Sequence, residues 1–123
     1  MESVSITIPA SPEYVRVARL VAAGVASRLG FSIDDIEDLK IAVDELAAYV
    51  TGKQGRSGNL TITFDIGDAE MEVAGRAALT DVENLRTELT DFSKMILDTV
   101  VQEAVLGQTD GMPSFRFVKS KKS

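Results

Sequence analysis

The chain has 123 residues, 45% of them hydrophobic and 26% charged, a balance that predicts a single globular domain over residues 1–123. Because histidine and cysteine are absent, we exclude Ser-His-Asp and Cys-His hydrolases, disulfide frameworks and thiolate metal sites. The formal net charge of −6 argues against direct nucleic-acid binding and suits a protein partner with a basic surface. No segment has the pattern of a membrane span or a signal peptide, so we expect a cytoplasmic protein.

The N-terminal part of the chain predicts a strand and then a helix. Apolar and polar residues alternate from Val4 to Ile8, which is typical of a strand with one buried face. Ser11 followed by Pro12 is a helix start, and this helix should run to Leu29. The apolar residues expected to form its buried stripe are Tyr14, Ala18, Val21, Val25 and Leu29.

A second amphipathic helix is predicted from Ser32 to Val50. Ser32 and Asp35 form a capping box, which satisfies N–H groups at the start of a helix. Glu45 and Tyr49 are one turn apart and share a face outside the apolar stripe. The stripe itself recurs at spacings of three and four residues: Ile36, Leu39, Val43, Leu46 and Val50.

The C-terminal half should contain a hairpin and a last strand. Apolar residues alternate from Leu60 to Ile66, and a turn should lead from this strand into a second one. Phe115 and Phe117 mark the last strand, and the basic tail that begins at Lys119 should be solvated.

Between the hairpin and the last strand, the sequence predicts a further helix. Thr80 and Glu83 form a capping-box pattern, and the helix should extend to about Leu106 with a break near Thr90. Its expected buried stripe consists of Leu85, Leu89, Phe92, Ile96 and Val100.

The order of these elements predicts an α/β two-layer sandwich. A mostly antiparallel mixed sheet should be covered on one face by about three helices. The patterning alone leaves the order of the strands within the sheet open.

The second helix resembles the first nucleotide motif of the GHKL ATPase and kinase superfamily, in its branch of small anti-sigma-factor kinases. In that motif a glutamate acts as general base, and an asparagine one turn later holds Mg-ATP. Ala42-Val43-Asp44-Glu45 fits the motif, and Tyr49 stands where the asparagine belongs. The resemblance implies the histidine kinase-like ATPase fold, with Glu45 as a vestigial candidate base.

The other nucleotide motifs of that family are degenerate in this chain. Gly75 remains of a motif whose aspartate receives adenine, but no carboxylate stands beside it. No glycine lies between Asp81 and Lys94 to form a phosphate cradle. Near the end, only Gly111 and the hydroxyl of Ser114 remain of the last motif. We therefore interpret Tyr49 and these three positions as vestigial nucleotide-binding positions, and we expect no cofactor and no metal.

The resemblance implies a regulatory function in transcription. Our first hypothesis is an anti-sigma-factor-like domain that acts by binding a sigma factor or a STAS-type anti-sigma antagonist, without ATP-dependent kinase activity. Arg16 and Arg19, on one side of the first helix, are the candidate partner-binding residues.

Two alternatives stay open. One is an active serine-protein kinase that uses Mg-ATP to phosphorylate the STAS-type antagonist. The other is a structural dimerisation domain of a signalling complex, and the sequence does not decide whether the chain is a homodimer.

Overall fold

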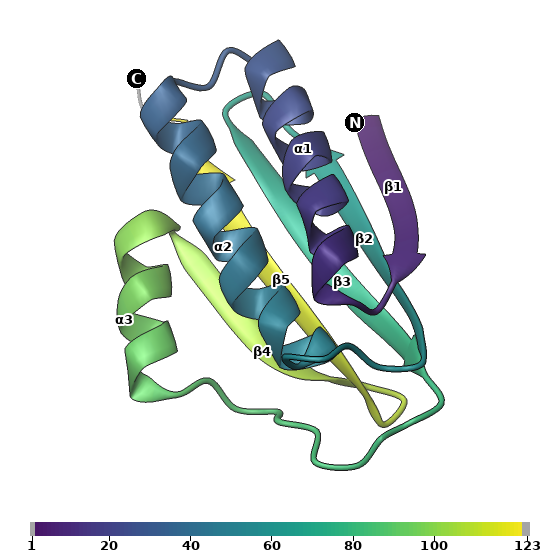
Figure 1. Cartoon of the computed structure of the whole chain (residues 1–123). Coiled ribbons are helices and arrows are strands. Elements are labelled where there is room, and N and C mark those ends of the chain that lie inside the picture. The colour runs from purple at the N-terminus through teal and green to yellow at the C-terminus, as the bar shows by residue number, and fades with distance from the viewer. Residues whose placement is uncertain (1, 122–123) are drawn as a thin grey trace.

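A computed structural model describes residues 2–121, in which a sheet and a layer of helices lie face to face (Figure 1). Within these residues, five strands form one sheet in the order β1-β2-β3-β5-β4, and all neighbours are antiparallel. Three helices cover one face of the sheet, so the predicted α/β two-layer sandwich is confirmed. None of these three helices is long and apolar enough to cross a membrane. The elements are β1 Glu2–Pro9, α1 Pro12–Arg28, α2 Ile33–Thr51, β2 Gly58–Ile66, β3 Glu70–Leu79, α3 Asp91–Val100, β4 Glu103–Thr109 and β5 Met112–Ser120.

The central helix is α2, and it packs as predicted. The hydroxyl of Ser32 accepts a hydrogen bond from the N–H of Asp35 at 3.1 Å, so the expected cap is present. α2 contacts α1 on one side, α3 on the other and β5 beneath it (Figure 1). Ile36 is partly exposed, whereas the rest of the predicted stripe is fully buried: Leu39, Val43, Leu46 and Val50.

The first helix buries only part of the predicted stripe, in which Ala18 is fully buried. Tyr14, expected to be buried, is 42% exposed, and Val21, Val25 and Leu29 are only partly buried. The buried positions of α1 are Val15, Ala18, Ala22 and Ala26. Alanine side chains let a helix approach its neighbours closely, so packing volume rather than hydrophobicity decides which side of α1 is buried.

The predicted start of the third helix at Thr80 is wrong, because the helix begins later in the chain. Residues 81–90 contain neither helix nor strand, and α3 begins only after Thr90, whose side chain provides the N-terminal cap. Thr80 follows the end of β3, and the carboxylate of Asp81 accepts the N–H of Glu83 at 3.0 Å. This local turn satisfies the backbone without a helix, which explains why the capping-box pattern is misleading here.

The predicted helix is also too long, because its C-terminal part is the strand β4. Ala104 and Leu106 lie opposite Phe117 and Phe115 on β5, so cross-strand pairing outweighs the helical periodicity. The stripe prediction fails in part as well. Phe92 is 66% exposed, whereas Val100 is buried as predicted, together with Ser93 and Leu97, which the prediction did not include.

The prediction of a solvated tail is wrong for Lys119, which is 1% exposed (Lys122 lies outside the described residues). Its ammonium group lies 3.2 Å from a carboxylate oxygen of Asp38 and 3.5 Å from one of Asp35. It also donates a hydrogen bond of 2.8 Å to the carbonyl oxygen of Val100. One side chain thus joins β5 to the start of α2 and the end of α3.

We expect Lys119→Met to lower the free energy of unfolding by about 3–5 kcal/mol, because it leaves a buried carboxylate without its cation. Lys121→Met is the matched control, since Lys121 is exposed and its side chain donates, among residues 2–121, only to the carbonyl of Leu29. Urea denaturation of both variants measures the difference. Equal losses in the two variants would contradict the structural role of Lys119.

Candidate functional site

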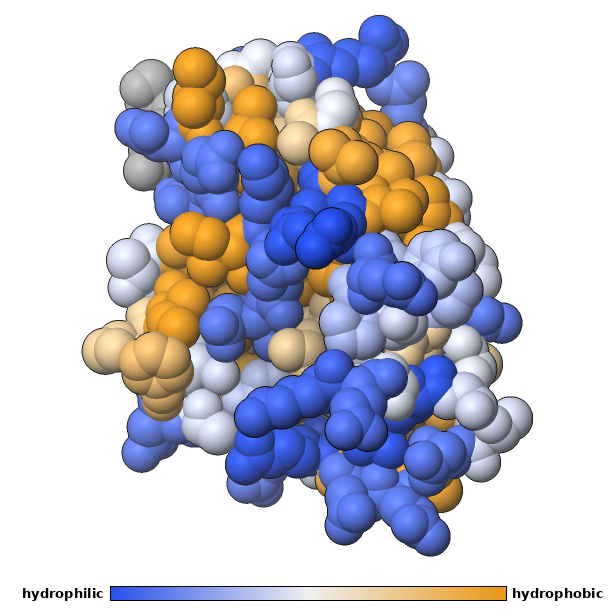
Figure 2. Space-filling view, in the orientation of Figure 1, coloured by the Kyte–Doolittle hydropathy of each residue, from blue (hydrophilic) through white to orange (hydrophobic). Residues whose placement is uncertain are grey.

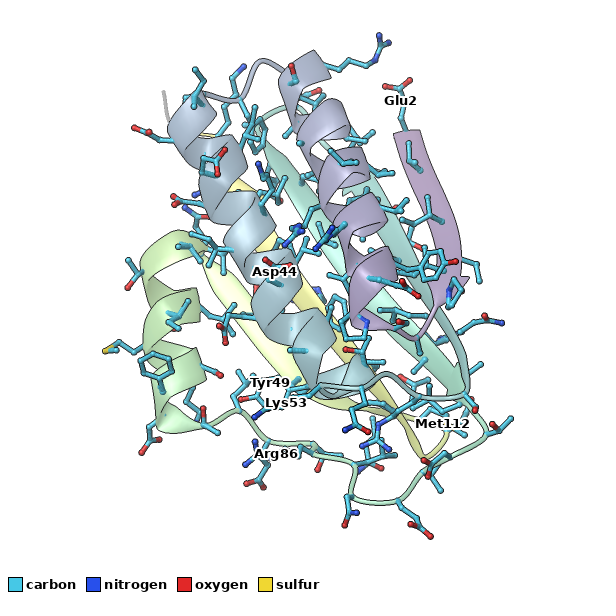
Figure 3. The ribbon with its side chains drawn as sticks, viewed as in Figure 1. Glu2, Asp44, Tyr49, Lys53, Arg86 and Met112 are labelled. Carbon is cyan, nitrogen blue, oxygen red and sulfur yellow. The ribbon has the colours of Figure 1, made fainter. Side chains whose placement is uncertain are left out.

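A cavity of about 710 Å³ opens between the N-terminal half of α1 and the C-terminal half of α2 (Figure 3). The segments that follow α2 and β3 complete its wall. Figure 2 shows a hydrophilic surface over this end of α2, whereas apolar side chains gather towards the other end of the helices. The cavity is lined by Pro12, Val15, Arg16, Arg19, Asp44, Glu45, Ala48, Tyr49, Thr51, Gly52, Lys53, Arg56, Asn84, Arg86, Thr90 and Ser93.

A chain of hydrogen bonds on one side of the cavity links Glu45 and Tyr49 to the start of α3. The hydroxyl of Tyr49 accepts the N–H of Thr90 at 2.9 Å and donates to the hydroxyl of Ser93 at 2.8 Å. Ser93 in turn donates to a carboxylate oxygen of Glu45 at 3.0 Å. The Tyr49 hydroxyl is thus hydrogen-bonded within the protein and helps to cap α3.

The surroundings of Tyr49 also change its acidity. Burial alone would raise the pKa of Tyr49, but hydrogen bonds with Ser93 and Thr90 and the positive charge of Arg86 act in the opposite direction. The net effect is a pKa below the usual value for tyrosine.

Positively charged side chains surround the opening. Nη1 of Arg19 donates to both carboxylate oxygens of Asp44, at 2.8 and 3.0 Å, and thereby joins α1 to α2. Arg56 donates to the carbonyl oxygens of Glu83 and Asn84 at 2.7 and 3.4 Å. These bonds fix the segment before α3 against the loop after α2.

Four of the candidate residues named from the sequence come together in this cavity. Arg16 and Arg19 lie on α1, and Glu45 and Tyr49 lie on α2. Sequence reasoning missed Lys53, Arg56, Arg86, Thr90 and Ser93. The spacing of Thr90 and Ser93 is a helix-capping pattern that could have revealed these two residues. The three basic residues lie in loops, where the sequence has no periodicity that would mark them.

The other three candidates lie outside this cavity. Gly75 is covered by Phe115, whose ring a Cβ at position 75 would overlap, so this glycine permits close packing within the sheet. The hydroxyl of Ser114 lies 3.2 Å from that of Thr109 on the neighbouring strand. Gly111, with φ of 77°, forms the turn between β4 and β5. Among residues 2–121, no group of three or more acidic side chains could hold a metal ion.

Known proteins share this architecture, although no protein-family profile matches the chain. The serine-protein kinase RsbW of Oceanobacillus iheyensis is 40% identical over 90 residues, which are 69% of this chain and 57% of that protein. The RsbW of Bacillus cereus strain AH820 is 38% identical over 101 residues, 77% of this chain and 63% of that protein.

A solved structure of the RsbU and RsbW domains of Rv1364c from Mycobacterium tuberculosis has the same fold. Its TM-score is 0.70 at 14% identity, and the match covers 98% of this chain and 32% of the other. The architecture is the histidine kinase-like ATPase fold. With the Glu45 helix and the RsbW relatives, this shows that the chain belongs to the GHKL superfamily, as an RsbW-like member.

We expect Tyr49→Phe to lower the free energy of unfolding by about 1–3 kcal/mol, because it leaves the N–H of Thr90 and the hydroxyl of Ser93 without their partner. Amide hydrogen exchange should accelerate at the start of α3. Tyr14→Phe is the control, since the Tyr14 hydroxyl makes no hydrogen bond within residues 2–121, and it should cost less than about 0.5 kcal/mol. A Tyr49 variant as stable as the Tyr14 variant would contradict the capping role.

Proposed function

We propose that this chain is an anti-sigma-factor-like regulatory domain that acts by binding a protein partner, without ATP-dependent kinase activity. The observation that carries this proposal is the hydrogen-bond chain from Tyr49 through Ser93 to Glu45. A general base must be able to accept a proton from a bound substrate. Here one carboxylate oxygen of Glu45 accepts a hydrogen bond from Ser93, which in turn accepts one from Tyr49, so the two motif positions are tied to the start of α3.

The position of Tyr49 supports the same conclusion. A phenol offers no amide oxygen for Mg-ATP, and its ring lines the cavity where the resembling family places its asparagine. Gly75 packs against Phe115, so the space on the side where a Cβ would point is filled by the protein's own side chain. These features argue against the nucleotide-binding mode of the family.

The relatives and the charge suggest the kind of partner. RsbW-type proteins are the relatives of this chain, and we infer a sigma factor or a STAS-type anti-sigma antagonist as the partner. A chain with a net charge of −6 attracts a basic protein surface. Arg16 and Arg19 lie at the cavity, where they would contact acidic groups of the partner. Such a regulator would act in the cytoplasm.

The alternative function is an active serine-protein kinase that uses Mg-ATP. One observation favours it, because Glu45 does line a cavity of about 710 Å³, which is within the usual range for small-ligand sites.

The test measures binding of a sigma factor and a STAS-type antagonist from the same organism, with and without Mg-ATP. We expect one of them to bind, with an affinity that falls as salt is added, because screening acts over about 8–10 Å. Millimolar Mg-ATP should neither change this affinity nor support phosphate transfer to the antagonist.

The melting temperature separates the two functions. A ligand at 100 times its Kd stabilises a protein by about 2.7 kcal/mol, which raises the Tm of a small domain by several degrees. A shift of that size with Mg-ATP, lost in Glu45→Ala, would restore the kinase hypothesis. Binding of neither protein, or preferred binding to duplex DNA, would refute the regulatory proposal.

A further inference from the structure

Basic side chains gather at the cavity although the protein as a whole is acidic. Five cationic residues line it, against the two carboxylates of Asp44 and Glu45, whereas the whole chain carries a net charge of −6. Figure 3 shows two of the five, Lys53 at the end of α2 and Arg86 on the segment before α3, near Tyr49. The five are Arg16, Arg19, Lys53, Arg56 and Arg86.

Most of this positive charge is not neutralised within the protein. Arg19 is paired with Asp44, but no ion pair among residues 2–121 includes Arg16, Lys53, Arg56 or Arg86. Like charges held around one cavity repel each other, and this repulsion is relieved when an anion binds.

Arg56 adds positive charge to the cavity although its own polar contacts lie within the protein. Its terminal nitrogens are held by backbone carbonyls, yet its Nε is buried and has no hydrogen-bond partner among the described residues. A nitrogen buried in this way has no surface open to the cavity, so the charge of Arg56 acts on an anion there without a direct hydrogen bond from Nε.

The carboxylates at the cavity disfavour a metal ion beside such an anion. Asp44 accepts both of its hydrogen bonds from Arg19, and Glu45 accepts one from Ser93. Mg²⁺ is usually held through one or two carboxylates, and here both oxygens of Asp44 and one of Glu45 already accept hydrogen bonds, so a metal ion would have to displace Arg19 or share Glu45 with Ser93. Guanidinium groups, in contrast, match the geometry of phosphate oxygens and bind them directly.

We propose that this cavity is a metal-independent binding site for a phosphate group. The group is carried either by a small phosphate ester or by a phosphorylated residue of a protein, and its oxygens are held by Arg16, Arg86 and Lys53. The site is distinct from Mg-nucleotide binding, because Mg²⁺ neutralises the phosphate charge and should weaken this interaction instead of mediating it.

The first experiment measures the Kd of inorganic phosphate and pyrophosphate by calorimetry, against sodium chloride at the same ionic strength. We expect saturable binding that weakens when Mg²⁺ is added to pyrophosphate. The double variant Arg16→Gln/Arg86→Gln should raise the Kd about tenfold or more. A single hydrogen bond to a charged group already contributes more free energy than a tenfold change in Kd requires.

The matched control is Arg28→Gln/Arg76→Gln, which makes the same change of charge at two exposed arginines outside the cavity. It should leave the Kd within about twofold. Equal weakening in both double variants, or no saturable binding of any probe including the phosphopeptide below, would overturn the proposal. Tighter binding of pyrophosphate with Mg²⁺ would also overturn it.

A second arm distinguishes the sources of the phosphate. A phosphoserine peptide is compared with the same peptide without phosphate and with free phosphoserine. Tighter binding of the phosphopeptide than of free phosphoserine supports a protein-borne group, and equal or tighter binding of free phosphoserine supports a small ester. Equal binding of the two peptides, together with no binding of free phosphoserine, would refute a phosphate site.

Discussion

The helical layer of this molecule, and the cavity within it, are placed by the packing of α2 on the sheet. The buried stripe of this helix fixes its rotation, and the rotation decides that Asp44, Glu45 and Tyr49 face away from the core. α1 and α3 then pack on its two sides, so the cavity is the space that remains between the helices and the loops. Because an amphipathic helix buries one apolar stripe, its hydrophobic pattern also determines which polar side chains face the cavity on the opposite side.

The outward face of α2 is joined to its surroundings by polar contacts that each link two elements. Arg19 and Asp44 connect α1 to α2, and the hydroxyl of Tyr49 connects α2 to the start of α3. Arg56 holds the segment that has neither helix nor strand. The result is a cavity with fixed walls and basic side chains at its opening, in which the residues of a catalytic motif serve as structural contacts. The anion that we propose for this cavity would meet charges that are already in place.

The parts of this structure that the sequence predicted are the ones determined locally. The cap at Ser32, the stripe of α2 and the shared face of Glu45 and Tyr49 all depend on residues within a few positions of one another. The errors arise where distant residues decide. β4 forms because β5 pairs with it, and Lys119 is buried because carboxylates more than 80 positions earlier in the chain face it. The basic residues of the loops reach the cavity only through the fold, so no periodicity could reveal them.

β5 lies between β3 and β4 in the sheet, although it follows both of them in the chain. During synthesis on the ribosome, β4 emerges before its only neighbour exists, and β3 keeps an unpaired edge until residues 112–120 have been added. An unpaired edge can pair with a strand of another chain, which is a common route to aggregation. If synthesis stops before β5, neither β4 nor β5 can join the sheet, and the edge of β3 is exposed to other chains.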